Sequence, residues 1–213
     1  MNTMSYATGP IEQYLSDAAS DKPAPGGGSV GALVGALASS MSEMAANFTV
    51  GKKKYADVEP QVRACLDRLE PCRRQLLALV DADVAAYEAV GAAYGMPKDS
   101  HEQRAARKQA IQQALRDAME VPLSIMRQCV VVAEASLELV EIANRNLLTD
   151  VGVSAILAEA ACAAARLNVE VNLNLIEDAD VPKQVRPELD ELTETTERCR
   201  REVARQVGQY LSQ

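Results

Sequence analysis

The amino-acid sequence predicts an all-α fold, an antiparallel bundle of about six helices, several of them long and kinked. Apolar side chains recur every three or four residues over long stretches, and no segment alternates apolar with polar residues as a strand does. The chain has no Trp and one Phe, so its core must be built from Ala, Val, Leu, Ile and Met, which favours closely packed helices. Turn residues divide the chain, as a single domain of residues 1–213, into helices over 10–20, 28–50, 59–94, 100–143, 150–177 and 187–212.

Several expected helices carry local signals of their own. Asp57 is a candidate cap for the third helix, whose first turn contains Pro60, where a missing N–H costs nothing. Ser100-x-x-Gln103 has the pattern of a capping box at the start of the fourth helix. Pro71 and Pro122 lie inside long helical patterns and should kink them. The last helix repeats apolar residues at a three–four spacing typical of bundle packing, at Leu189, Leu192, Cys199, Val203, Val207 and Tyr210.

Composition and charge exclude several classes of protein. The formal net charge is −8, which argues against a nucleic-acid binder, since such a protein needs a basic surface. The five cysteines are odd in number and lack CxxC spacing, as expected of reduced residues in a cytosolic protein. No secretory signal is visible at the start. The run Val30–Val50 is long enough to span a membrane but contains serines, a glutamate and an asparagine, so we expect a cytoplasmic protein with no membrane partner.

A glycine-rich segment, Gly26–Gly31, satisfies the GxGxxG pattern without its structural context. The preceding residues Asp21–Pro25 contain two prolines and cannot form the buried strand that a dinucleotide-binding site requires, and no Gly-Lys-Ser/Thr follows as in a phosphate-binding P-loop. Two interpretations stay open. Glycines that recur every four residues let another helix approach closely, and a glycine-rich first turn leaves backbone N–H groups free for a phosphate or carboxylate.

The segment Lys52–Lys54 is an isolated positive cluster in an acidic chain. Such a cluster is commonly a solvated turn that neutralises the carboxyl end of the preceding helix. It could also attract a polyanionic ligand. The sequence does not choose between these two interpretations.

Several segments, in order along residues 10–180, resemble the cyclodeaminase/cyclohydrolase family. That family includes the cyclodeaminase domain of formiminotransferase-cyclodeaminase and the stand-alone bacterial methenyltetrahydrofolate cyclohydrolases. The segments are Pro23–Ser29, Asn47-x-Thr49–Tyr55, Asp83, Ala92–Lys98, Ala105–Arg107, Glu120–Leu123, Thr149–Val153 and Ala165-x-Leu167–Val169-x-Val171-Asn172.

The resemblance implies an all-helical fold, a homodimer and a folate-binding groove near the subunit interface. The segment Tyr94–Lys98 is more similar to the stand-alone cyclohydrolases. The sequence departs from the family pattern at Ala143–Asn146, where a Gly-Asn turn is usual, and at Thr149, where Ser is usual. Both departures lie beside Asp150.

Carboxylates are the natural acid–base candidates for this family's chemistry, because the sequence shows no metal-ligand spacing and no Ser-His-Asp set. A methenyl bridge is a cationic amidinium carbon, and its hydrolysis needs a base for the attacking water and an acid for the departing nitrogen. Helical projection places Asp83 in the middle of an apolar stripe, where burial would raise its pKa, and places Asp81 on the opposite, solvated side. A hydrogen-bonded structural role for Asp83 remains an alternative.

Other polar residues are candidates of a different kind. Asp150 and Asn168 are 18 residues apart, five helical turns, so they share a face, and we expect this pair to bind the amino and ring N–H groups of the pterin. Asp150 could also be an ordinary helix-capping residue. His101 is expected to be an exposed residue of a helix's first turn, and Glu120 is a weaker carboxylate candidate.

These observations predict a methenyltetrahydrofolate cyclohydrolase in which a carboxylate assists water attack on the methenyl carbon. The alternatives are a formiminotetrahydrofolate cyclodeaminase that releases ammonia, and a non-catalytic helical interaction module. We expect no metal and no cofactor beyond the tetrahydrofolate substrate, which could be polyglutamylated. The predicted catalytic residues are Asp83 and Asp150, and the predicted substrate-binding residues are Gly27, Gly28, Ser29, Asn47, Thr49, Lys52, Lys53, Lys54, Tyr55, Tyr87 and Asn168.

Overall fold

The structure is a computed structural model that describes residues 5–212. Over that range it contains six α-helices and two 3-10 turns and no strand, which confirms the all-α prediction. Three of the helices are long, at 36, 42 and 32 residues. In chain order the helices are α1 (Ile11–Ala18), α2 (Gly27–Asn47), α3 (Glu59–Tyr94), α4 (His101–Ile142), α5 (Leu148–Leu173) and α6 (Asp180–Leu211), with 3-10 turns at Lys53–Tyr55 and Arg145–Leu147.

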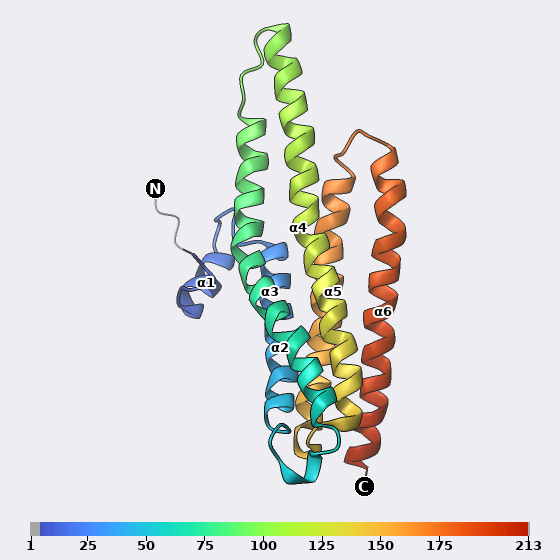
Figure 1. Cartoon of the computed structure of the whole chain (residues 1–213). Coiled ribbons are helices and arrows are strands. Elements are labelled where there is room, and N and C mark those ends of the chain that lie inside the picture. Colours follow the sequence, from blue (N-terminus) through green and yellow to red (C-terminus); the bar gives the residue numbers. More distant parts are fainter. Residues whose placement is uncertain (1–4, 213) are drawn as a thin grey trace.

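Helices α2 to α5 form a four-helix core in which consecutive helices run antiparallel (Figure 1). α2 packs between α3 and α5, and α6 packs in the groove between α4 and α5. α1 lies outside the bundle beside α3, and α3 is visibly bent along its length (Figure 1). α3 and α4 continue past the other helices as a two-helix arm, whereas α2 begins lower than its neighbours (Figure 1). The space beyond the first residue of α2 is therefore bounded by α3, α4 and α5.

Small residues on α2 allow its neighbours to pack very closely. A Cβ atom added at Gly31 would lie 3.5 Å from the carbonyl oxygen of Ala161 on α5. A Cβ added at Gly35 would lie 3.0 Å from Cδ2 of Leu76 on α3. A Cβ at Gly31 would be in ordinary van der Waals contact with α5, and one at Gly35 would require Leu76 to shift, so side chains larger than alanine have little room at either position. The close-packing interpretation of the glycine repeat is confirmed.

The capping box predicted at the start of α4 is present. The backbone N–H of Gln103 donates to Ser100 Oγ, and the Gln103 side-chain oxygen accepts from the Ser100 N–H. Both hydrogen bonds are 3.1 Å long. The predicted cap of α3 is wrong. Val58 occupies the cap position and Asp57 is exposed, with no side-chain capping bond, although Pro60 does lie in the first turn.

The predicted start of the last helix, at residue 187, is also wrong. α6 begins at Asp180 and carries Pro187 in its interior, so the helix tolerates the loss of one backbone hydrogen bond. Val181 and Val185, which precede the proline, pack against the hydrophobic core. This burial extends the helix through a segment whose prolines indicated a loop.

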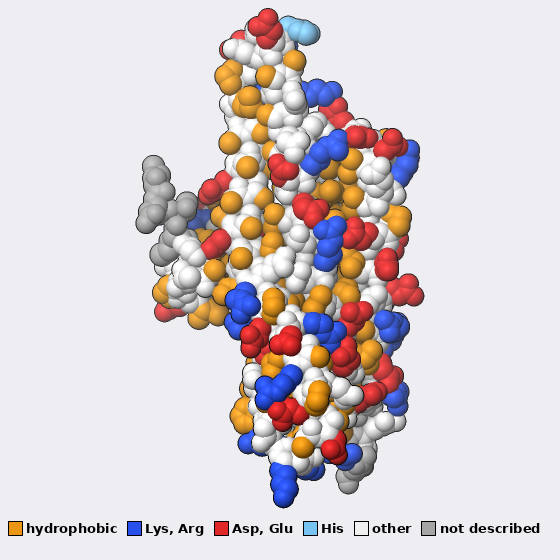
Figure 2. All heavy atoms as spheres, viewed as in Figure 1, with side chains coloured by type: hydrophobic (Ala, Val, Ile, Leu, Met, Phe, Trp, Pro, Cys, Tyr) orange, Lys and Arg blue, Asp and Glu red, His pale blue; other side chains and the backbone are white. Residues whose placement is uncertain are grey.

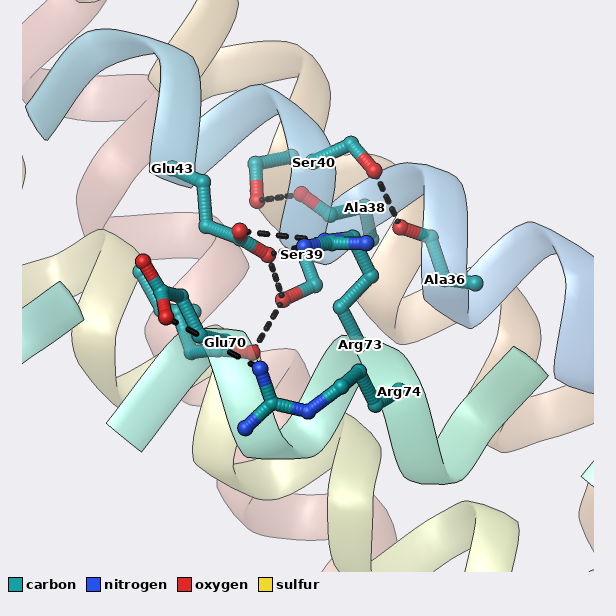
Figure 3. Close-up of polar contacts among 10 residues, drawn as sticks. Ala36, Ala38, Ser39, Ser40, Glu43, Glu70, Arg73 and Arg74 are labelled. Atoms are coloured by element: carbon teal, nitrogen blue, oxygen red, sulfur yellow. Dashed lines mark hydrogen bonds and ion pairs between the residues drawn. The ribbon is translucent and has the colours of Figure 1, made fainter. Parts of the chain in front are cut away.

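Polar groups inside the bundle are paired. The Glu43 carboxylate on α2 is 7% exposed, and it accepts bonds from Arg73 Nε on α3 at 2.9 Å and from Ser39 Oγ at 3.1 Å (Figure 3). Ser39 also donates to the carbonyl of Leu69. These contacts tie α2 to α3 at mid-bundle and leave Glu43 fully partnered. All five cysteines are free and buried.

One side of the bundle, formed by α2 and α5, exposes several large apolar side chains. We call it the α2–α5 face and define it by its exposed apolar residues, which are Val30, Leu37, Phe48, Val153, Ile156, Leu167 and Val171. Glu43 is the one charged residue of α2 and pairs with α3, while three of the four charged residues of α5 pair with α6. On the opposite side, formed by α3, α4 and α6, acidic and basic side chains interleave (Figure 2).

The segment Arg145–Leu173, which includes α5, is long and apolar enough to cross a membrane by length and composition. The sequence had drawn attention to Val30–Val50 instead. The apolarity of α5 has a cause within the bundle, because it packs against α2, α4 and α6 and contributes half of the α2–α5 face.

Candidate active site

A pocket of about 360 Å³ occupies the space beyond the first residue of α2. Its floor is the proline-rich segment that leads into the helix, and its walls are α3, α4 and α5. Asp83 is the one acidic or basic residue among its described lining residues. The pocket is lined by Pro23, Ala24, Gly26, Gly27, Asp83, Ala86, Tyr87, Val90, Leu115, Ala118, Pro122, Asn168, Val171, Asn172 and Leu175.

Asp83 projects from α3 to the start of α2. One carboxylate oxygen accepts the backbone N–H of Ser29 at 2.9 Å, in the first turn of the helix, where amides have no partner of their own. A Cβ at Gly28 would overlap the carboxylate, so only glycine allows this approach. Burial raises the pKa of the Asp83 carboxyl above its ordinary value, and the bond from Ser29 offsets part of that rise. The site therefore holds a half-buried carboxylate whose second oxygen is unoccupied by any described protein donor.

The glycine-rich turn mainly holds the Asp83 carboxylate and exposes few of its own groups to a ligand. Gly27 lines the pocket, and Gly28 makes room for Asp83. The Ser29 side chain is fully buried, and its hydroxyl shares a 3.1 Å hydrogen bond with the hydroxyl of Tyr14 from α1. The structure thus places the Ser29 side chain behind the pocket wall, contrary to the expectation that it contacts substrate.

Asn168 and Asn172 contribute amides from α5, one helical turn apart. Gly27 packs directly on Asn168, since an added Cβ would lie 3.3 Å from its Nδ2. Sequence analysis singled out Asn168 but not Asn172, although the spacing of four residues places both on one face of the helix. Tyr87 is 55% exposed and forms part of the α3 wall. The pocket thus combines an aromatic ring and two amides with the single carboxylate.

The predicted residues near residue 50 lie at the other end of α2. This helix has 21 residues, so its two ends are separated by about 30 Å at 1.5 Å per residue. Lys52, Lys53 and Lys54 are exposed there, and no described acid lies within ion-pairing distance of them. Asn47 is exposed nearby. We call this region the basic end.

Thr49 and Tyr55 join two loops at the basic end. Thr49 is fully buried and its Oγ1 accepts the backbone N–H of Asn144 at 2.8 Å. The Tyr55 hydroxyl donates to the Asn144 side chain and accepts the Arg145 N–H. A second hollow, of about 610 Å³, opens beside Tyr55 between the loop before α3, the end of α4, the turn into α5 and the end of α6. These contacts assign Thr49 a structural position, since its hydroxyl is enclosed by protein.

Asp150 lies in the first turn of α5, also at the basic end. It is half-buried and makes no side-chain hydrogen bond or ion pair with a described residue, so it does not cap the helix. Asn168 is 18 residues further along the same helix, about 27 Å away. The two residues share a face as predicted, but they cannot contact one pterin within a single chain.

The remaining candidates lie outside the pocket. Asp81, expected in solvent, is half-buried and accepts the backbone N–H of Tyr6 at 2.8 Å, so it anchors the N-terminal segment. That expectation was wrong because residues from outside the bundle cover this side of α3. His101 is exposed in the first turn of α4, as predicted. Glu120 is exposed and pairs with Arg127.

Comparisons with known proteins agree with this architecture. A family model described as formiminotransferase-cyclodeaminase matches residues 10–191. A methenyltetrahydrofolate cyclohydrolase of Methylorubrum extorquens is 39% identical over 182 residues, which cover 85% of this chain and 88% of the relative. The formimidoyltransferase-cyclodeaminase of Rattus norvegicus is 32% identical over 82% of this chain, which spans only 32% of that longer protein.

A solved structure shows the same fold. The formiminotetrahydrofolate cyclodeaminase of Thermotoga maritima superposes with a TM-score of 0.86 at 33% identity, over 96% of this chain and 98% of the other. Both the sequence match and the structural match extend over nearly the whole bundle. The chain belongs to the formiminotransferase-cyclodeaminase family.

Proposed function

We propose that this protein is a methenyltetrahydrofolate cyclohydrolase that converts the methenyl form to 10-formyltetrahydrofolate. The observation that carries the proposal is Asp83, a half-buried carboxylate with raised pKa and the one charged side chain lining a largely apolar pocket. A carboxylate in such surroundings attracts a cationic carbon strongly, because little water screens it. The 39% identity to a cyclohydrolase over most of both chains supports the same choice.

The chemistry follows from the position of the carboxylate. The ionised Asp83 side chain attracts the amidinium carbon and accepts a proton from the water that attacks it. The tetrahedral carbon then releases N5, which takes up a proton, and the carbonyl group stays on N10. Substrate cation and water thus give the formyl product and one proton. The proposed reaction uses no metal and no cofactor beyond the folate itself.

The alternative reaction is cyclodeamination of formiminotetrahydrofolate. It also passes through a tetrahedral carbon between nitrogens, with ammonia as the leaving group. The likeness to the Thermotoga maritima cyclodeaminase favours it. The same pocket serves either reaction, so activity measurements distinguish the two.

The test is direct. Purified protein is mixed with methenyltetrahydrofolate and the decay of its near-ultraviolet absorbance is followed, with Asp83→Asn as the matched control. The proposal requires acceleration over buffer by the native protein. If the decay matches the buffer rate, the cyclohydrolase proposal is wrong, and ammonia release from formiminotetrahydrofolate then tests the alternative. Failure of both reactions would indicate a non-catalytic interaction module.

The proposed active form is a cytoplasmic homodimer built on the α2–α5 face. None of the residues that define that face is charged, and a group of exposed apolar side chains of this size is typical of a subunit interface. A two-fold axis across the middle of antiparallel α2 helices places each basic end beside the partner's pocket. Asp150 then acts at the partner's pocket, and Lys52–Lys54 bind the glutamate tail of a polyglutamylated folate.

Sedimentation velocity tests the dimer. Ile156→Lys places a charge in the middle of the face, where Ile156 is 53% exposed, and should produce monomers. Leu211→Lys is the matched control, since Leu211 is 65% exposed on α6, away from the face. A native monomer, or an Ile156→Lys variant that stays dimeric, would contradict this interface.

A further inference from the structure

The two asparagines of the pocket have their amide orientation fixed by α5 itself. The Nδ2 group of Asn168 donates to the carbonyl of Ala164 at 2.9 Å. The Nδ2 group of Asn172 donates to the carbonyl of Asn168 at 2.9 Å and to that of Ala118 on α4 at 3.5 Å. A backbone carbonyl can only accept, so the NH₂ groups must face the backbone.

The consequence is a pocket wall that presents hydrogen-bond acceptors. The Asn172 amide uses both of its N–H groups and the Asn168 amide uses one of its two, while neither side-chain oxygen accepts a bond from a described protein donor. The free oxygen of Asp83 adds a third acceptor across the pocket. The other lining side chains are apolar, except for the hydroxyl of Tyr87.

We propose that Asn168 and Asn172 form an acceptor pair that recognises the substrate by the N–H donors on its pyrimidine edge, chiefly the exocyclic 2-amino group. The inference rests on the proposed function, which supplies a reduced pterin as ligand. The edge of a tetrahydropterin carries the 2-amino group beside the ring N3–H, with the acceptor N1 on its other side, so the amino group and N3–H offer donors where the pocket offers acceptors.

This arrangement gives selectivity as well as affinity. Leaving a half-buried acceptor without a donor costs more free energy than a hydrogen bond between neutral groups contributes. The site therefore discriminates against ligands that lack the amino group. Gly27 lies beside the Asn168 amide, since a Cβ added at Gly27 would be 3.3 Å from its Nδ2 and 3.6 Å from its Oδ1. Asp83 is left to interact with the reacting carbon. Recognition and chemistry are thus assigned to different helices of the pocket.

The acceptor pair is tested by a thermodynamic cycle that combines a change in the protein with a change in the ligand. Calorimetry measures the affinity of the native dimer for 5-formyltetrahydrofolate and for its counterpart with hydrogen in place of the 2-amino group. We expect removal of the amino group to weaken binding about tenfold in the native protein. In Asn172→Leu, which keeps the side-chain volume without an acceptor, the two ligands should bind within about twofold of each other. Asn174→Leu, at an exposed amide just past the end of α5, should behave as the native protein.

The outcomes separate this inference from the proposed function. An equal penalty for the missing amino group in native protein and Asn172→Leu overturns the inference, even if turnover is present. Discrimination by the native protein without turnover of methenyltetrahydrofolate supports the inference and overturns the cyclohydrolase proposal. Native protein that binds neither ligand overturns both. If Asn172→Leu does not fold, Asn172→Ala replaces it, because alanine keeps the helix and still removes the acceptor.

Discussion

The two ends of α2 differ in nearly every physical respect, although each carries a segment that resembles the same family. At Gly27 the surroundings are largely apolar, and Asp83 is the one charged residue lining the pocket. At Lys52–Lys54 three cations project into solvent. A desolvated carboxylate suits bond-making chemistry, whereas solvated cations suit capture of a flexible anion. The two proposed roles are therefore about 30 Å apart, the length of the helix between them.

The strongest test of this contrast is removal of the carboxylate. Asp83→Asn keeps an acceptor for the Ser29 N–H, so the fold should persist, while turnover should fall about 10²- to 10⁴-fold through loss of the base. Initial rates with methenyltetrahydrofolate measure the effect. Asp81→Asn is the matched control, because Asp81 lies on the same helix and contacts the N-terminal segment. Native rates in Asp83→Asn would assign that residue a structural role.

An experiment that mixes two variants tests whether the two ends of α2 meet across the proposed dimer interface. Asp83→Asn and Asp150→Asn should each be nearly inactive alone. A mixed dimer regains one intact site, so a refolded equimolar mixture should recover about a quarter of native activity under two-fold symmetry. No recovery would show that each site lies within one chain, and a fully active Asp150→Asn would remove Asp150 from the catalytic residues.

The sequence was sufficient to predict the bundle because helical periodicity, prolines and the capping box are local signals. It missed the start of α6, where burial of Val181 and Val185 overrides the prolines. In the pocket, the apolar stripe correctly marked Asp83 as half-buried. Ser29 and Asp81 were misplaced because Tyr14 and Tyr6, from outside the core helices, cover them. Contacts from such peripheral segments leave no periodic pattern.

The pairing of Asp150 with Asn168 shows a different limit. Projection along a helix axis gives the face on which a residue lies but not its position along the axis. The two residues share a face but are separated by about 27 Å. Asn172 was missed although it lies one turn from Asn168 on the same face of α5. Only the pocket in the structure shows that its side chain lines the site.

Gly28 makes room for the Asp83 carboxylate at the glycine-rich turn. Replacing Gly28 therefore tests whether the position of that carboxylate matters for activity. In Gly28→Ala the new Cβ would overlap the Asp83 carboxylate and force it away from the Ser29 N–H. We expect kcat to fall at least about tenfold, since a misplaced catalytic group loses alignment with its target. Gly26→Ala is the control, because a Cβ there meets nothing within 4 Å. Equal activity of the two variants would show that the carboxylate position is not critical.

The raised pKa of Asp83 predicts opposite effects of pH on activity and stability. The base must be ionised, so kcat/KM should fall with decreasing pH, starting above the ordinary range of an aspartate. Because the folded protein holds this proton more tightly than the unfolded chain, stability is lost as pH rises through the folded pKa. Asp83→Asn should therefore raise Tm by a few degrees at pH 7 and by little near pH 4. A variant less stable than native at pH 7 would mean that hydrogen bonding to the carboxylate outweighs its desolvation.

The smallest expected effect concerns the basic end. Lys53→Ala removes one exposed cation, and exposed ion pairs contribute about 0.2–1 kcal/mol, so affinity for a polyglutamylated substrate should fall up to about fivefold. Affinity for the monoglutamate, which lacks the extended anionic tail, should change less than about twofold. KM values for both substrates measure this, ideally at low ionic strength, where screening is weakest. Lys183→Ala is the control, because Lys183 is also exposed but pairs with Asp180 at the start of α6. An equal change in KM for both substrates in Lys53→Ala would mean that the lysines do not bind the glutamate tail. The two ends of α2 would then differ only in that one holds the reacting groups and the other is a solvated turn.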